Sequence, residues 1–268
     1  MIIAVDTGGT KTLVARFSAD GTIEASEKFP TPIDTDKYLE QLTTTIRAVS
    51  GDKTPQVIAI AMPGWIQDDI IISCGNLPWR NFPIKAELAK HFKGTAILVE
   101  NDANLGGLGE VHTLKKIPHR CLYVTVSTGI GGGFIVDGAI DPATRTGEIG
   151  SMRLEFDGKV VQWEQIASGK ALAKEYHSLA SDLTDHRHWR AVANRLSRGF
   201  LAFLPILRPD MVIIGGGVGA HFDNFATYLS DDIGKYLPKE YQCPIVQAQH
   251  PEEAVIHGCY RYAIDRHG

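Results

Sequence analysis

The sequence lacks the features that mark three common classes of protein. Its four cysteines, Cys74, Cys121, Cys243 and Cys259, lie far apart without a CxxC pair, so neither a disulfide framework nor a zinc site is predicted. Lysine and arginine number 27 against 31 acidic residues, which leaves no broad basic surface for nucleic acid. No apolar run approaches the roughly 18 residues that cross a bilayer, and no basic and apolar leader precedes Ile2. We therefore expect a soluble, cytoplasmic protein with reduced thiols and with neither nucleic acid nor a membrane as a partner.

Glycine, in contrast, is abundant, with 27 residues in a chain of 268. Glycine-rich turns expose backbone N–H groups, which can hold a small anion without any net positive charge. A chain of this length can bury one large core or two modest ones. We expect two lobes and several turns lined by backbone.

Periodic apolar residues predict a mixed α/β chain. Strands are expected at residues 2–6, 13–18, 22–29, 57–62, 70–73 and 97–99, twice within 121–140, at the start of 210–219 and at 244–248. Helices are expected at residues 35–49, 84–92, 102–110, from 164 onward, at 187–204 ending before Pro205, at 221–233 and at 252–265. This order predicts strands covered by helices.

The first glycine turn, TGGTKT, follows the strand at residues 2–6. Successive N–H groups of such a turn can face a phosphate, with Thr7 and Thr10 adding hydroxyls and Lys11 a cation. Asp6 would lie within reach of a metal ion bound to that phosphate. A Walker A loop is excluded because GxxxxGK[ST] must lead into a helix. An ordinary hairpin turn is the alternative.

The chain repeats this opening. The segment CLYVTVSTGIGGGFIVDGAI has the same order of strand, Thr-Gly turn, strand and Asp-Gly turn as IIAVDTGGTKTLVARFSADG, so that Thr128-Gly129 corresponds to Thr7-Gly8. Two copies of one unit predict two similar lobes whose turns face one cleft. A Rossmann motif is not indicated, because the second turn enters a strand.

The stretch ILVENDANLGGLGE is where the chemistry is expected. An apolar strand at residues 97–99 delivers Asn101 and Asp102 to the start of a helix, and ligands gather at such carboxyl ends of strands. A phosphoryl transfer needs a carboxylate base near its phosphate turns. The alternative is that Asp102 or Asn101 only caps the helix.

Other candidate contacts lie beside glycine turns. Gly64 ends a strand, where it allows close approach to a ligand, although a plain turn is as common. Glu148 lies between two glycines, and Glu164 begins a helix; both could accept hydrogen bonds from sugar hydroxyls, or Glu164 could serve the helix dipole. The cluster of Gly215, Gly216 and Gly217 could hold an adenosine or a phosphate.

Taken in order, these motifs resemble the ROK sugar kinases of the actin-like, hexokinase-type ATPase superfamily. The resemblance spans almost the whole chain. The motifs that carry it are Asp6-Thr7-Gly8-Gly9-Thr10-Lys11, Pro63-Gly64, Asn76-Leu77-Pro78-Trp79, Glu100-Asn101-Asp102-Ala103-Asn104, Ser127-Thr128-Gly129-Ile130-Gly131-Gly132-Gly133 and Gly215-Gly216-Gly217.

The resemblance implies a duplicated, two-lobed actin-like ATPase (ribonuclease H-like) α/β fold with a central cleft. Residues 1–112 with 254–268 would form the smaller lobe and residues 113–253 the larger. The implied reaction transfers the terminal phosphoryl group of ATP, with Mg²⁺ near Asp6, to the 6-hydroxyl of a hexose, glucose first, in a chain that can form a homodimer. Asp102 would be the base. The implied sugar contacts are Gly64, Asn76, Asn101, Asp102, Glu148 and Glu164, and the implied ATP contacts are Asp6 to Lys11, Thr128, Gly129, Gly131, Gly132 and Gly215 to Gly217.

Two departures from the family pattern limit the assignment. Gly150-Ser151-Met152 stands where most members have a histidine, and no cysteine-rich zinc loop separates Glu148 from Glu164. We therefore predict no structural zinc, and leave open which hexose or N-acetylhexosamine is used and whether ATP or polyphosphate is the donor. A sugar sensor that has lost turnover is the alternative from another class. A ROK repressor is disfavoured because no helix-turn-helix precedes the first strand, and a nicotinamide oxidoreductase rests only on GGGVG.

Overall fold

The computed structural model describes residues 1–51, 53–250 and 253–267. The chain divides into two compact units. The first unit comprises Met1–Gly109 and Glu253–Gly268, and the second comprises Glu110–Glu252. Each unit is built around one five-stranded mixed sheet.

The sheet of the first unit has the order β3-β2-β1-β4-β8. Its strands are β1 (Ile2–Thr7), β2 (Lys11–Phe17), β3 (Ile23–Pro30), β4 (Val57–Met62) and β8 (Ala96–Asn101). Strands β1, β2 and β3 are antiparallel neighbours, whereas β1, β4 and β8 run parallel. The parallel part therefore brings the carboxyl ends of β1, β4 and β8 to one edge.

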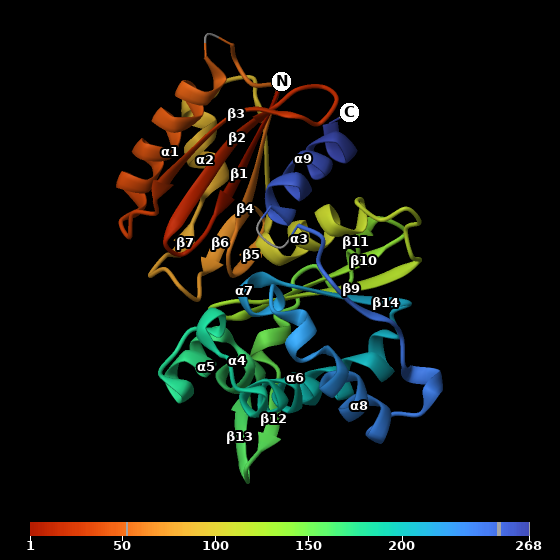
Figure 1. Cartoon of the computed structure of the whole chain (residues 1–268). Helices are drawn as coiled ribbons and strands as arrows, with labels where there is room; N and C mark the ends of the chain where they lie inside the picture. Colours follow the sequence, from red (N-terminus) through yellow and green to blue (C-terminus); the bar gives the residue numbers. More distant parts are fainter. Residues whose placement is uncertain (52, 251–252, 268) are drawn as a thin grey trace. The chain divides into compact units, whose positions relative to one another are not determined.

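Helices cover both faces of this sheet (Figure 1). Helices α1 (Thr35–Ser50) and α2 (Ile84–His91) pack on one face, and α9 (Ala254–His267) packs on β1 and β4 from the other. Helix α1 begins where the Asp34 carboxylate accepts hydrogen bonds from the N–H groups of Asp36 and Lys37, as an N-cap does. It ends at Gly51, whose φ of 62° stops the helix.

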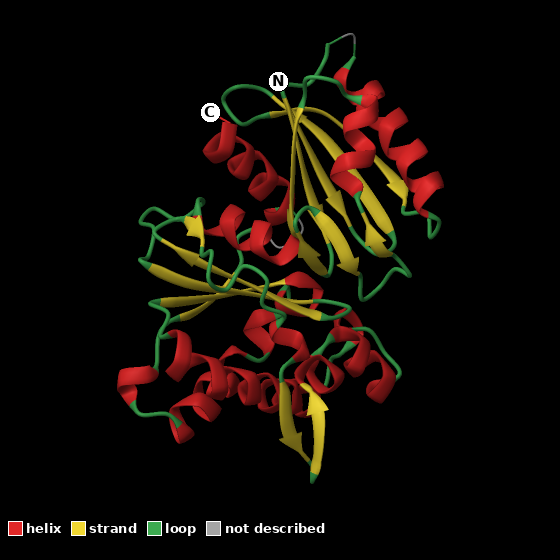
Figure 2. Ribbon diagram, turned by 180° about the vertical axis from the view of Figure 1, so that it is seen from behind, coloured by secondary structure: helices red, strands yellow, loops and turns green. Residues whose placement is uncertain are grey.

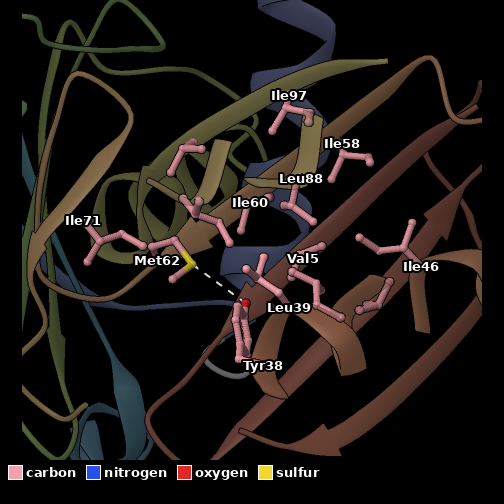
Figure 3. Close-up of a cluster of buried hydrophobic side chains, with 14 of the residues drawn as sticks. Val5, Tyr38, Leu39, Ile46, Ile58, Ile60, Met62, Ile71, Leu88 and Ile97 are labelled. Atoms are coloured by element: carbon pink, nitrogen blue, oxygen red, sulfur yellow. Dashed lines mark hydrogen bonds between the residues drawn. The ribbon is translucent and has the colours of Figure 1, made fainter. Parts of the chain in front are cut away.

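The core of the first unit follows from strand alternation. Ile58, Ile60 and Met62 on β4 and Val5 on β1 are all fully buried and meet Tyr38 from α1 (Figure 3). Successive side chains of a strand point to opposite faces, so residues two apart share the face under α1. A small antiparallel sheet of β5 (Trp65–Gln67), β6 (Ile70–Ser73) and β7 (Arg80–Phe82) adds Ile71 and Phe82 to the same core.

The second unit repeats the sheet. Its order β11-β10-β9-β14-β15 has the same pattern of antiparallel and parallel neighbours as the first. The strands are β9 (Arg120–Val126), β10 (Ile130–Val136), β11 (Ala139–Ile140), β14 (Met211–Gly215) and β15 (Ile245–Gln247). The repeat recognised in the sequence is thus a repeat of topology.

Helices of the second unit pack beside this sheet, and a two-stranded hairpin extends beyond these helices, away from the sheet (Figure 2). The elements are α4 (Trp163–Ala167), α5 (Gly169–Tyr176), α6 (His186–Leu207), α7 (Gly216–Gly219), α8 (Ala226–Tyr236), β12 (Arg153–Phe156) and β13 (Lys159–Gln162). Trp163 lies against Gly199 of α6, where an added Cβ would approach Trp163 Cε2 to 2.2 Å. Helix α3 (Asp102–Val111) spans the boundary at residues 109 and 110.

Two helix boundaries predicted from the sequence are wrong. Helix α6 continues through Pro205 to Leu207, because the proline removes only one N–H near the end and the N–H of Arg208 still donates to the carbonyl of Leu204 at 3.0 Å. The helix expected from residue 221 begins at Ala226, after a 3₁₀ turn at Phe222–Asn224. The predicted helix start at residue 252 lies outside the described residues.

All four cysteines are free, and Cys74, Cys121 and Cys259 are buried. None of the helices described is both long enough and apolar enough to cross a membrane.

Helices α9 and α3 touch through their backbones. A Cβ on Gly258 would lie 1.8 Å from the carbonyl oxygen of Leu105, and one on Gly109 would lie 2.1 Å from that of Ala254. Contacts this short leave no room for a methyl group on either glycine. Each of the two carbonyl groups belongs to a helix backbone and cannot move aside.

We expect Gly258→Ala to destabilise the first unit by about 1–3 kcal/mol, the usual consequence of overpacking. Thermal unfolding of the variant measures this as a lower midpoint. Gly234→Ala in α8 is the matched control, because no described atom beyond its chain neighbours and its own helix backbone lies within 4 Å of the added Cβ. Helix propensity alone should stabilise this variant by about 0.5–1 kcal/mol. Equal midpoints for the two variants would contradict the close packing of α3 and α9.

Candidate active site

Asp102 lies at the carboxyl end of β8 and begins α3. Its neighbour Asn101 has taken the capping role: Asn101 Oδ1 accepts from the N–H groups of Ala103 at 2.9 Å and Asn104 at 3.2 Å. Asn101 Nδ2 donates to the carbonyl oxygen of Gly64 at 3.1 Å. Asp102 also accepts from the N–H of Ala103, at 2.8 Å. The capping function thus does not require the carboxylate of Asp102.

The protonation of Asp102 is strongly perturbed. Burial raises the pKa of Asp102 to about 7, and the negative charge of Asp6 raises it as well. Burial also raises the pKa of Asp6 to about 6, against the opposing effect of Lys28. A base with a pKa near neutral is well matched to accept a proton at physiological pH.

The first glycine turn connects β1 and β2 in a closed loop. The N–H of Gly8 donates to the carbonyl of Lys11 at 2.9 Å, and Thr31 Oγ1 donates to the carbonyl of Gly8 at 2.8 Å. Thr7 is fully buried and its hydroxyl lies 2.7 Å from Tyr38 Oη, so this hydroxyl faces the core. The side chains of Thr10 and Lys11 are exposed and remain available to a ligand.

Of the predicted sugar contacts, Asn76 adjoins this turn and Gly64 adjoins Asn101. A Cβ added to Gly9 would lie 2.9 Å from Cβ of Asn76, so the Asn76 loop touches the turn. Gly64 has a φ of +94°, and a Cβ there would lie 2.3 Å from the carbonyl oxygen of Ser73. Only glycine fits that position. The first unit thus contains the predicted base, the first glycine turn, Gly64, Asn76 and Asn101.

In the second unit, Glu164 lies at the second glycine turn. Glu164 Oε2 accepts from the N–H of Ile130 at 3.5 Å and lies 2.9 Å from the position of a Cβ on Gly129. The 3₁₀ turn Ile149–Ser151 packs on the adjoining strand, since a Cβ on Gly132 would strike Ile149 Cδ1 at 2.2 Å. The exposed Glu148 precedes this turn and the exposed Ser151 ends it.

A cavity of about 520 Å³ adjoins the second glycine turn. Its walls are largely apolar, and they come from the turn, α5, α7 and the segment between α5 and α6. The lining residues are Ser127, Thr128, Gly169, Lys170, Ala173, Leu179, Ala180, Ser181, Gly217, Val218 and His221. Its size is that of a small-ligand pocket.

The three glycines at the end of β14 have different roles. A Cβ on Gly215 would lie 2.5 Å from Tyr123 Oη, and one on Gly216, whose φ is +80°, would lie 2.6 Å from the carbonyl oxygen of Val126. Packing on β9 therefore requires both. Of the three, Gly217 lines the cavity, and no atom lies within 4 Å of its added Cβ.

Several cavity residues are not indicated by any pattern in the sequence. Lys170, Ala173, Leu179 and His221 carry no motif and come from different segments. His221 lies against Trp189, with ring centroids 5.6 Å apart. Only folding brings these residues beside Thr128.

No group of three His, Cys, Asp or Glu side chains is arranged as metal ligands in the part of the chain that the structure describes.

We expect Asp102→Asn to stabilise the protein increasingly as pH rises. The pKa of Asp102 rises from an ordinary 3.8 to about 7 on folding, so between these values the folded state keeps a proton that the unfolded state loses. Ionisation therefore destabilises the wild type progressively up to about pH 7, whereas Asn does not ionise. Urea unfolding at pH 4 and pH 8 measures the free energy of unfolding of both proteins. The difference in this free energy between the variant and the wild type should grow by roughly 1–4 kcal/mol from pH 4 to pH 8. The exposed Asp231→Asn is the control, and the same small difference at both pH values for Asp102→Asn would contradict the raised pKa.

The fold is shared with solved structures of sugar kinases. A ROK family glucokinase from Streptomyces griseus in complex with glucose and AMPPNP matches with a TM-score of 0.82 at 23% identity, over 98% of this chain and 99% of that chain. The inorganic polyphosphate/ATP-glucomannokinase from Arthrobacter sp. strain KM matches with a TM-score of 0.77 at 25% identity, over 99% of each chain. A ROK family transcriptional regulator also matches, with a TM-score of 0.78 at 18% identity over 97% of this chain and 78% of that one. The predicted actin-like ATPase fold is confirmed.

Sequence comparison agrees with this fold. The glucokinase of Thermotoga maritima is 29% identical over 261 residues, which cover 81% of this chain and 82% of that protein. The model of the ROK family matches residues 2–266. This chain therefore belongs to the ROK family, as its ordered motifs predicted.

Proposed function

We propose that this protein is an ATP-dependent hexose kinase that phosphorylates the 6-hydroxyl of its sugar, with glucose as the first candidate. The observation that carries the proposal is Asp102, a carboxylate with a pKa of about 7 at the carboxyl end of β8, in the same unit as the first glycine turn. A kinase of this type needs a base matched to neutral pH near its phosphate turns.

In the proposed reaction Asp102 accepts the proton of the sugar hydroxyl as that oxygen attacks the terminal phosphorus. The bond between that phosphorus and the bridging oxygen of the donor breaks, and ADP leaves with the electron pair. The backbone N–H of Gly9 and the exposed cation of Lys11 would stabilise the charge on the transferred group. Gly64, Asn76 and Asn101 would orient the sugar within the first unit, and Glu148 and Glu164 stay predictions from the family resemblance.

The cavity in the second unit supports a nucleotide as the donor. Its apolar walls, which include Ala173, Leu179 and Val218, suit a base and a ribose. A polyphosphate chain would instead need a row of cations, and Lys170 is the only lysine or arginine among the residues that line this cavity. The position of Thr128 beside the cavity suits the donor's phosphates.

Magnesium fits the proposed site. Burial disfavours the charged form of Asp6, and a bound cation would favour it. Mg²⁺ is commonly held by one or two carboxylates together with waters and substrate phosphates, so Asp6 would suffice as the protein ligand. The ion would neutralise charge on the donor's phosphates.

A sugar sensor of the same fold is the second candidate, motivated by Ser151. The exposed serine ends a 3₁₀ turn where most family members have histidine, so an imidazole is missing from that place. A sensor would bind a hexose without releasing ADP. A coupled assay with ATP and polyphosphate against a panel of hexoses and N-acetylhexosamines distinguishes a sensor from a kinase and identifies the sugar and the donor.

Asp102→Asn should lower kcat on the order of 10²-fold or more, because the positioned base is removed. Steady-state rates and a circular dichroism spectrum of the folded variant measure this. In the wild type, kcat/KM should rise with pH to a plateau with a midpoint near pH 7, because the base must be ionised. Undiminished turnover by the variant would exclude Asp102 as the base.

Ala173→Phe should raise the KM for ATP roughly tenfold or more while the KM for the sugar changes little, because the larger side chain fills the cavity. Initial rates at varied ATP and at varied sugar separate the two constants. Lys174→Ala is the control, since Lys174 is exposed on the same helix and does not line the cavity. An unchanged KM for ATP would show that the nucleotide binds elsewhere.

A further inference from the structure

Tyr38 connects helix α1 to the first glycine turn. The tyrosine is fully buried, and its phenolic oxygen lies 2.7 Å from Oγ1 of Thr7, the last residue of β1. The same oxygen lies 4.0 Å from the sulfur of Met62, as the dashed line in Figure 3 shows. Burial raises the pKa of Tyr38 well above its usual range, so the phenol keeps its proton.

The first glycine turn is also held by the hydroxyls of Thr12 and Thr31. Thr12 Oγ1 lies 2.9 Å from Thr31 Oγ1, and that oxygen donates to the carbonyl of Gly8 at 2.8 Å. The N–H of Thr31 donates to the carbonyl of Thr10 at 3.0 Å. The turn is thus held at Thr7 and Gly8 by side-chain hydroxyls and at Thr10 by the backbone N–H of Thr31.

The ring of Tyr38 also reaches the loop that carries Asn76. It packs on Trp79, with centroids 4.6 Å apart and planes inclined by 48°. Trp79 Nε1 donates to the carbonyl of Ile33 at 2.7 Å, which fixes the end of that loop. At the other side of the loop, the backbone of Gly9 touches Asn76. Tyr38 therefore contacts both the phosphate turn and the proposed sugar loop.

We propose that Tyr38 is a positioning residue that holds the first phosphate turn in register with the Asn76 loop for phosphoryl transfer. Tyr38 is fully buried and would touch neither substrate, so it acts through Thr7 and Trp79. The inference rests on the proposed kinase function. It concerns a residue that no motif of the sequence singled out.

Simple packing does not account for the hydroxyl of Tyr38. A phenylalanine would keep the ring contacts with Trp79 and Phe82 and would avoid desolvating a polar oxygen. The hydroxyl instead gives Thr7 a partner, without which the buried Thr7 oxygen would lose its hydrogen bond in the core. The contact therefore fixes the side chain at the base of the turn.

Tyr38→Phe tests the inference because it removes only the oxygen. Loss of one buried hydrogen bond should lower kcat roughly three- to tenfold with ATP and sugar KM values within about twofold. Hydrogen exchange, followed by mass spectrometry, should be faster in the peptide that contains residues 7–11. Thr45→Val is the matched control: Thr45 is a buried threonine on the same helix, and its hydroxyl bonds Gln41, outside the turn.

Thr7→Val and the double variant complete a mutant cycle. If Tyr38 acts through Thr7, adding Tyr38→Phe to Thr7→Val should change kcat less than twofold, which is strong non-additivity. Full additivity, or a Tyr38→Phe variant with wild-type kcat and wild-type exchange at residues 7–11, would overturn the inference.

The two proposals can fail separately. A wild-type protein that phosphorylates no sugar would refute the kinase function, and hydrogen exchange of residues 7–11 would still decide whether Tyr38 holds the turn. A wild-type kinase whose Tyr38→Phe variant behaves as Thr45→Val does would refute only the role of Tyr38.

Discussion

Two carboxylates that are held partly out of water shape the first unit. Burial raises the pKa of Asp6 near the end of β1 and the pKa of Asp102 after β8. The negative charge of Asp6 raises the pKa of Asp102 further. Such an arrangement weakens the fold progressively as the pH rises from the ordinary pKa of 3.8 to the raised values of about 6 and 7. The surrounding structure supports it: Asn101 caps α3 and binds Gly64, so the position of Asp102 does not depend on its own charge.

The sequence predicted the parts of this structure that follow from periodicity and from turn residues. The buried strands β1 and β4, the helix that begins at Asp102 and the order of strands around both glycine turns all follow from local pattern. The repeat also predicted two similar lobes, and the two sheets of the structure share one order because the same sequence of strand and turn folds in the same way twice. The ordered motifs identified the family.

The rest depended on contacts between distant residues. Nothing in the sequence shows that the hydroxyl of Thr7 turns toward Tyr38, since that requires knowing which side of the strand α1 covers. The requirement for Gly215 and Gly216 comes from Tyr123 and Val126 on a neighbouring strand. The cavity walls from α5 and the following segment have no periodicity that could link them to Thr128. Pro205 lies within α6, although proline usually ends a helix. The hydrogen bond from Arg208 to Leu204 closes the last turn around the proline.

The two described cores share no side chain, and this separation has a practical consequence. A chain with two cores need not melt in a single step, so one transition temperature would describe only its weaker half. The four tryptophans divide evenly, with Trp65 and Trp79 in the first unit and Trp163 and Trp189 in the second. Each half therefore carries its own fluorescent reporters, and replacing one pair by phenylalanine leaves the emission of the other half to be followed alone.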